Sequence, residues 1–258
     1  MEHLHRSRYL RWTVLIVVLA NSFFNVLYKA LNLPGGTVKE VSDSYKTLFT
    51  PAGYAFAIWG VIYLSFIIYA IYQLLPAQRM ARFYDRMAWP VIAANLLCMV
   101  WQVAFRNYII GGSVVIILAT LCVAIIMQVK VRKEAHNYFT WLTVPFSLFL
   151  GWICVATIAN VASWLVATGW QGGAWSASAW AIIMVLTAGV ISFILGRAYR
   201  DFIIPVVIAW ALAAIYAEVL HVDMQVATTS LVMGIVAAIW ALGVFLFYRK
   251  KRSLVTGI

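Results

Sequence analysis

Eight apolar stretches, separated by short polar segments, follow one another along the chain. They cover residues 12–33, 52–75, 88–106, 109–129, 138–167, 177–196, 202–220 and 224–248. Each is long enough to cross about 30 Å of bilayer hydrocarbon as a helix. None alternates apolar and polar residues strictly enough for a strand of an outer-membrane barrel. The pattern therefore predicts an all-α integral membrane protein with about eight transmembrane helices.

The composition also points to the bilayer as the solvent of this chain. Of its 258 residues, 65% are hydrophobic and 10% are charged, and the mean hydropathy is +0.92. A soluble domain is about half apolar and about a quarter charged, and a water-soluble fold of this size could not bury so much apolar surface. We therefore expect the lipid bilayer to surround the protein, with no separate soluble catalytic domain.

Basic residues mark one side of the predicted membrane. The net charge is +11, and most of the 19 lysines and arginines lie at the two termini and in the loops after the second, fourth and sixth stretches. The other side has only Lys29, Lys39, Lys46 and Arg106. Because positively charged loops stay in the cytoplasm, we expect a cell-membrane protein with both termini cytoplasmic. The charges form no single basic face, which argues against a nucleic-acid partner.

Two features near the N-terminus each allow two interpretations. The first apolar stretch follows basic residues, as in a signal peptide, but it continues to Leu33 and so favours a retained first helix. The longest polar connection, Pro34 to Thr50, is either a lid over the bundle or a solvated connector.

Residues suited to demanding chemistry inside the membrane are scarce. Cys98, Cys122 and Cys154 lie in apolar runs without CxxC spacing, and the four histidines form no HxxxH or ExxH pair. We therefore expect neither a metal site nor a disulfide framework. Glu218 is the only acidic candidate for a mid-membrane position, and it lies near the end of a span. We assign no catalytic residue and no required cofactor.

The polar residues deep in the predicted spans are neutral. They are Asn21, Asn25, Asn95, Gln102 and Asn160. Asn21 and Asn25 are four residues apart, which places them on one face of a continuous helix. In a membrane such residues either form hydrogen bonds between helices or contact a ligand, and the sequence leaves both roles open.

Tryptophan is unusually frequent, with 12 residues in the chain. Those near span ends fit the aromatic belts at the membrane surfaces. Five others lie further inside, where an indole either packs between helices or stacks on a planar ligand. They are Trp59, Trp101, Trp152, Trp210 and Trp240. An aromatic-lined cavity with few polar groups is the usual form of a site for a flat apolar molecule.

Three motifs on the second, third and fifth stretches combine several of these residues. They are Phe56-Ala57-Ile58-Trp59-Gly60-Val61-Ile62-Tyr63, Asn95 followed by Trp101-Gln102-Val103-Ala104-Phe105, and Trp152, Ala156, Asn160 and Trp164 at intervals of four. In this order and on these helices, the motifs resemble those of the TspO/MBR family, the tryptophan-rich sensory proteins and the translocator protein. The resemblance covers about residues 10–167.

The resemblance implies an organisation and a ligand. It implies a TspO-like five-helix membrane core over residues 1–167, followed over 168–258 by three additional transmembrane helices and a basic C-terminal tail. It also implies a pocket for a planar tetrapyrrole, a protoporphyrin or haem-like molecule, with the loop at 34–50 as its lid.

The family's motif positions give the expected ligand-binding set, which is Trp59, Tyr63, Asn95, Trp152, Ala156 and Asn160. By this resemblance, Trp59 and Trp152 would stack on the ligand, while Tyr63 and Asn160 would supply polar contacts. Trp101 and Phe105 are expected instead to pack helices or to mediate self-association as a homodimer.

Two classes of function follow from the residues and the resemblance. The first is a membrane protein that binds a planar lipophilic small molecule for sensing, regulation or transport. The alternative is a secondary transporter or permease for a small lipophilic solute. Porphyrin photo-degradation is an activity that the resemblance brings with it, but no acid–base pair in the sequence supports ordinary catalysis, so we do not expect an enzyme.

Overall fold

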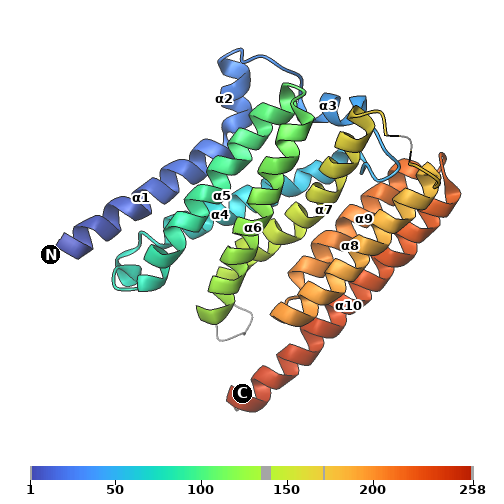
Figure 1. Cartoon of the computed structure of the whole chain (residues 1–258). Coiled ribbons are helices and arrows are strands. Elements are labelled where there is room, and N and C mark those ends of the chain that lie inside the picture. Colours follow the sequence, from blue (N-terminus) through green and yellow to red (C-terminus); the bar gives the residue numbers. More distant parts are fainter. Residues whose placement is uncertain (1, 135–140, 171, 257–258) are drawn as a thin grey trace.

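The chain folds into a bundle of helices. It is described from a computed structural model that covers residues 2–134, 141–170 and 172–256, with side chains described over 8–134, 141–170 and 172–247 (Figure 1). Over these ranges every regular element is a helix and no strand occurs, so the all-α prediction is confirmed. His136 and the beginning of the fifth stretch, 138–140, lie outside the described residues, as do the side chains of Arg249–Arg252 in the basic tail.

The helices follow the order of the predicted stretches. The elements are α1 (Glu2–Ser22), α2 (Phe24–Ala30), α3 (Val38–Ser44), η1 (Gly53–Ala57), α4 (Ile58–Tyr72), η2 (Pro76–Gln78), α5 (Arg82–Arg106), α6 (Ile110–Glu134), η3 (Trp141–Thr143), α7 (Val144–Ala167), α8 (Ala177–Tyr199), α9 (Ile203–Val219) and α10 (Met224–Thr256). Each apolar stretch contains one long helix or, in the first, the pair α1 and α2. The short helix α3 lies in the connection that the sequence marks as polar.

Helix length and apolar composition give a lower number of candidate membrane crossings than the eight predicted. Six of the described helices are long and apolar enough to span a membrane, or seven when the bent pair α1 and α2 counts as one. The remaining apolar helix, α9, has 17 residues, which extend about 26 Å at 1.5 Å per residue. Most of its side chains are buried, and it packs against α7, α8 and α10. The predicted total of eight transmembrane helices therefore stays a prediction.

The first span is broken at Phe23, where α1 and α2 meet at an angle of 61°. Asn21, on α1, is buried, and its Nδ2 donates a 2.9 Å hydrogen bond to Oδ1 of Asn95 on α5. Asn25, on α2, is exposed. The expectation that Asn21 and Asn25 share one helical face is therefore wrong, because the bend separates the two residues.

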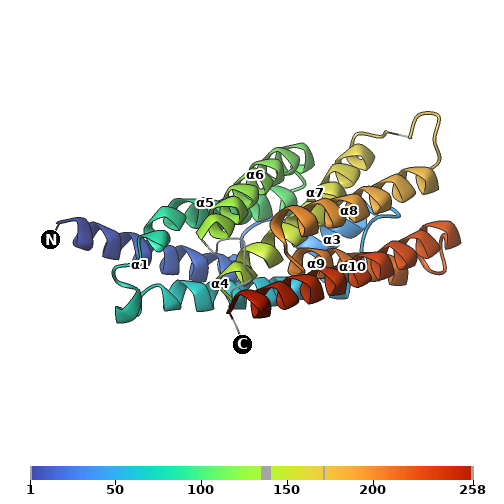
Figure 2. The ribbon, with the colours of Figure 1, turned by 90° about the horizontal axis from the view of Figure 1, so that it is seen from below.

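The bundle has two distinct ends (Figure 1). Both chain termini lie at one of them, here called the terminal end. The opposite end, which carries α2 and α3, is here called the loop end. In both views α7 lies between the group formed by α1, α5 and α6 and the group formed by α8, α9 and α10 (Figures 1 and 2).

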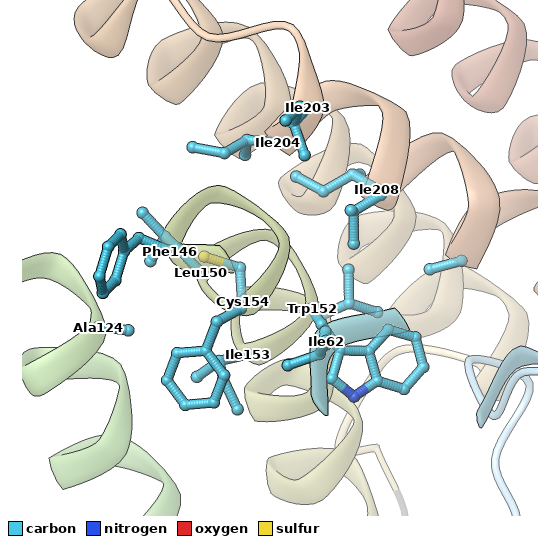
Figure 3. Close-up of a cluster of buried hydrophobic side chains, with 14 of the residues drawn as sticks. Ile62, Ala124, Phe146, Leu150, Trp152, Ile153, Cys154, Ile203, Ile204 and Ile208 are labelled. Carbon is cyan, nitrogen blue, oxygen red and sulfur yellow. The ribbon is translucent and has the colours of Figure 1, made fainter. Parts of the chain in front are cut away.

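Helix α7 is the centre of the packing. In its most apolar window 67% of the residues are buried, compared with 22% to 44% in the other candidate spans. It contacts α4, α6, α8 and α9. Figure 3 shows Phe146, Leu150 and Trp152 of α7 among side chains of α4, α6 and α9, including Ile62, Ala124 and Ile204.

One buried apolar cluster runs through the whole bundle. Its members include residues of α1, α4 and α7 and also residues of α9 and the first turn of α10. At Gly151 the backbone of α7 approaches α9 so closely that an added Cβ atom would lie 3.0 Å from Cβ of Val207. The domain division predicted at residue 167 stays a prediction, but the packing joins the helices on its two sides into one core.

A buried group of polar side chains lies near the terminal end. Asp201, in the turn between α8 and α9, pairs with Arg132 of α6 and accepts hydrogen bonds from Ser147 Oγ of α7 and from Gln128 Nε2. Asp201 is fully buried and Arg132 is 2% exposed. This charged pair was not predicted from the sequence, because Arg132 lies in a basic run typical of a solvated loop and Asp201 lies in no motif.

Asp223 anchors the start of α10 outside the membrane-spanning segments. Its Oδ1 accepts hydrogen bonds from the backbone N–H groups of Gln225 (3.1 Å) and Val226 (3.0 Å), and its Oδ2 accepts one from Ser178 Oγ of α8. The hydrogen bond from Ser178 and that from the Val226 backbone lower the pKa of the Asp223 carboxyl below its usual value. Asp223 therefore acts as an ionised cap on α10 and ties it to α8.

Replacing Asp223 by alanine is expected to lower the stability by about 1 kcal/mol at neutral pH, because the first backbone N–H groups of α10 lose their acceptor. Since the folded-state pKa lies below the unfolded value of about 3.9, this stabilisation is present above that value and is lost as the pH falls through the lowered pKa. Thermal unfolding of the detergent-solubilised protein and of Asp223→Ala, followed by circular dichroism, checks this. An equal difference between the two proteins at neutral and at strongly acidic pH would contradict it.

Candidate ligand-binding site

Two adjoining cavities lie toward the loop end of the bundle. The first, here called the apolar slot, has a volume of about 60 Å³ and lies among α3, α4, α5, α6 and α7. The second, here called the polar chamber, has a volume of about 350 Å³ and lies among α2, α3, α4 and α5. The two cavities share the walls formed by Val38, Phe56, Trp59, Cys98 and Trp101.

Tryptophan rings from three helices converge on the apolar slot. Trp59 of α4, Trp101 of α5 and Trp152 of α7 all line it. The Trp59 and Trp152 rings meet edge to face, with centroids 6.5 Å apart and planes at 81°. Trp101 stacks on Phe105, one turn later on α5, with centroids 4.9 Å apart. The slot is therefore an aromatic-walled space in which flat apolar groups could stack.

The polar side of the slot is organised by Asn160 of α7. Its Oδ1 accepts a 2.7 Å hydrogen bond from Nε1 of Trp101, and its Nδ2 donates a 2.9 Å hydrogen bond to Oγ of Ser113 on α6. These bonds fix the orientation of the Trp101 ring and join three helices. Asn160 therefore holds one wall of the slot in place.

Five of the six residues expected to bind the ligand border the two cavities. Trp59, Trp152, Ala156 and Asn160 line the slot, and Tyr63 lines the chamber. Tyr63 also stacks on Trp59, with centroids 5.3 Å apart.

Asn95 lies elsewhere. It accepts the hydrogen bond from Asn21, and its own Nδ2 donates to the carbonyl oxygen of Val91 at 2.8 Å. This arrangement matches the interhelical role that the sequence left open for Asn95.

One face of α5 supplies lining residues that the sequence analysis did not assign to the site. They are Cys98, Trp101, Gln102, Phe105 and Arg106. From the sequence, Trp101 and Phe105 were assigned to packing or self-association, and Arg106 was counted only as a charge on the less basic side of the membrane. Their spacing could have predicted that they line the same cavity, because positions three and four residues apart lie on one face of a helix.

The polar connection at 34–50 covers the site with a short helix. Val38 and Ser42 of α3 line the slot, and Lys39 lines the chamber. The helix begins with a capping box, in which Thr37 Oγ1 accepts from the Glu40 N–H at 3.1 Å and the Thr37 N–H donates to Oε2 of Glu40 at 2.7 Å. A hydrogen bond with Asp43 raises the pKa of Lys39, so Lys39 stays positively charged.

Gly35 fixes the approach of this connection to α5. Its φ is +112°, and an added Cβ atom would lie 2.5 Å from the carbonyl oxygen of Arg106. The neighbouring Gly36 N–H donates to the same oxygen at 3.0 Å, and Nε of Arg106 donates back to the Gly36 carbonyl oxygen at 3.1 Å. The entrance of the site is therefore held against the end of α5 by backbone contacts that only glycine allows.

Glu218 lies near the end of α9, as the sequence indicated, and pairs with Lys46 of the polar connection. Both residues border a separate cavity of about 520 Å³ between α7, α8 and α9 at the loop end. The ion pair therefore ties the covering segment to α9.

The fold and the site define a class: a helical membrane protein with a tryptophan-walled cavity beneath a covering loop at one end. A comparison with known protein families shows which family of this class the chain belongs to. A family model described as "TSPO-like protein" matches residues 11–243, so the chain belongs to the TSPO-like family. The match extends well beyond residue 167, where the resemblance read from the motifs ends. No curated protein and no solved structure matches the chain.

Proposed function

We propose that this TSPO-like membrane protein binds a planar apolar ligand of the tetrapyrrole type, and that this binding serves sensing, regulation or transport. The observation that carries the proposal is the convergence of Trp59, Trp101 and Trp152, from three helices, on one cavity. Flat aromatic faces with few polar groups suit a flat apolar molecule.

Binding of a tetrapyrrole requires the covering segment to move. The slot holds about 60 Å³, whereas sites for ligands of drug size hold about 300–1,000 Å³. The contacts that hold it closed include the two Gly36–Arg106 hydrogen bonds, the Lys46–Glu218 ion pair and the packing of the buried Val41 against Phe105 and Ile110. If these contacts broke, α3 would move away from α5, and the slot and the polar chamber would form one larger cavity. Residues 34–50 would then act as a lid.

The orientation in the membrane is part of the proposal. Three groups of basic residues, represented by Arg79, Lys130 and Arg197, lie at or near helix ends on the terminal end of the bundle (Figure 1). By the preference of positive charge for the cytoplasm, the termini are cytoplasmic in a cell membrane, and the site opens toward the opposite side.

Tryptophan fluorescence tests the proposal. Titration of the detergent-purified protein with protoporphyrin IX is expected to give saturable quenching in the micromolar range. Trp59→Phe and Trp152→Phe are each expected to weaken the affinity about fivefold, because the loss of a large stacking face costs roughly 1 kcal/mol. Trp240→Phe is the matched control, since Trp240 packs on Phe193 between α10 and α8. Quenching that does not saturate and is equal in all variants would mean simple partitioning of the dye and would refute the proposal.

A transporter for a small lipophilic solute is the second candidate, and the break between α1 and α2 favours it, because discontinuous helices are typical of transporters. Gly111, Gly112, Pro145 and Pro205 lie in the first turns of their helices and do not interrupt them, whereas Pro90 lies inside α5. Flux of protoporphyrin IX into proteoliposomes separates transport from binding alone.

A further inference from the structure

The polar chamber contains two buried polar groups without partners. Among the described residues, Oε1 of Gln102 and Nη1 of Arg106 are buried and form no hydrogen bond. The side chains belong to residues only 4% and 8% exposed. Both residues line the chamber and are one helical turn apart on α5. Buried polar groups in native structures are almost always paired, so the Arg106 Nη1 donor points to an acceptor that the chamber receives. Oε1 of Gln102 is itself an acceptor and fits the same group only with its amide turned over.

The Arg106 guanidinium keeps its positive charge available to the chamber. Its Nε donates to the Gly36 carbonyl oxygen, and its Cζ lies over the ring of Tyr28, 4.2 Å from the centroid. Among the described residues, no carboxylate lies within 4.0 Å of it. Of the two cationic residues that line the chamber, Lys39 is paired with Asp43, and the Glu40 carboxylate beside Gly36 caps the start of α3, so Arg106 is the charge available to a ligand.

We propose that Arg106 and Gln102 form an anion subsite for a carboxylate on the edge of the planar ligand. This inference rests on the proposed function, because the ligand's flat body would occupy the slot. Its carboxylate would extend into the chamber, which adjoins the slot at Trp59 and Trp101. Arginine N–H groups match a carboxylate in geometry and charge. Turning the Gln102 amide over presents its Nε2 as a second donor.

The geometry also determines which class of ligand the site would bind most tightly. A neutral planar molecule would fill the slot but leave the Arg106 charge unpaired, whereas an acid of the same shape would satisfy it. The preferred ligand class is therefore a flat apolar molecule with an acidic group on one edge, and an esterified form of the same molecule should bind less tightly.

A pair of matched ligands tests the subsite. Protoporphyrin IX and its dimethyl ester have the same flat ring, and only the former has free carboxylates. We expect the wild-type protein to bind the acid at least about tenfold more tightly than the ester. Arg106→Met should reduce this preference by weakening binding of the acid more than binding of the ester. A circular dichroism spectrum equal to that of the wild type shows that the variant is folded.

Lys29→Met is the matched control, because Lys29 is an exposed cation on α2 at the same end of the bundle, and it should keep the preference. Gln102→Leu should reduce the preference about threefold, which gives a second test if Arg106→Met does not fold. Equal binding of acid and ester by the wild-type protein, both saturable, would overturn the subsite while leaving the proposed function intact. Absence of saturable binding for either ligand would overturn both.

Discussion

Replacing Asp201 by asparagine should cost the protein about 3–5 kcal/mol of stability, the usual penalty for leaving a buried charge without its partner. Arg132 is 2% exposed and its partner carboxylate is fully buried, so water cannot replace the lost interaction. The asparagine keeps the shape of the side chain and removes only its charge. Because a native protein is typically stable by about 5–15 kcal/mol, we expect a large decrease in the melting temperature of the detergent-solubilised protein.

The same carboxylate also supports the start of α9. Its Oδ1 accepts hydrogen bonds from the backbone N–H groups of Ile203 (2.7 Å) and Ile204 (3.3 Å). Asparagine retains an oxygen for this role, so the expected loss in Asp201→Asn comes mainly from the unpaired Arg132. Asp201→Ala should be more damaging, because it removes the cap as well.

A double variant separates the buried charge from a general loss of packing. Arg132→Met combined with Asp201→Asn should recover part of the lost stability, because no charge then remains buried without a partner. Glu134→Gln is the matched control, since Glu134 pairs with Arg86 at 2.7 Å at an exposed position near the same end, and such pairs contribute less than about 1 kcal/mol. A melting temperature of Asp201→Asn equal to that of the wild type would show that the buried pair does not stabilise the fold.

The position of Arg132 explains why the sequence analysis missed this pair. Lys130, Arg132 and Lys133 form a compact basic run, which reads as a solvated segment after a span. On α6, however, Ala124, Gln128 and Arg132 are four residues apart and all buried. Helical periodicity therefore places Arg132 on the buried face of α6. The predicted end of the span at residue 129 followed from average hydropathy, which ignores this periodicity.

The apolar pattern predicted the helices well because hydropathy alone decides which segments leave water for lipid. It could not predict the bend at Phe23, since no proline or glycine marks that position. The bend separates Asn21 from Asn25 and turns α2 toward Arg106, whose guanidinium lies over Tyr28.

The candidate site was partly predictable for a different reason. Trp59, Trp152, Ala156 and Asn160 lie in motifs, and the structure places all four on one cavity. Arg106 was counted only as a charge on the less basic side of the membrane, because nothing in its local sequence shows that Gly36 and Tyr28 enclose it. Helix α3 was available from the sequence, since Thr37 and Glu40 have the spacing of a capping box.

Replacing Gly151 by leucine should lower the stability by about 2–3 kcal/mol, because α7 and α9 approach too closely there for a side chain. An added Cβ atom would lie 3.0 Å from Cβ and 3.2 Å from Cγ1 of Val207, and 3.3 Å from the Ile204 carbonyl oxygen. Leucine adds three further carbon atoms, and overpacking of this kind typically costs about 1–3 kcal/mol. The measurement is thermal unfolding in detergent, with Gly151→Ala as a smaller step.

The same substitution shows how the C-terminal helices support the site. Gly151 precedes Trp152, which lines the slot, so a displacement of α7 away from α9 should also weaken the quenching by protoporphyrin IX. Gly60→Leu is the matched control: Gly60 follows Trp59, another slot residue, but an added Cβ atom there meets nothing within 4 Å. It should keep both stability and binding. If Gly151→Leu melted like Gly60→Leu, α9 would not be packed against α7 as described, and α8–α10 would have no part in positioning Trp152.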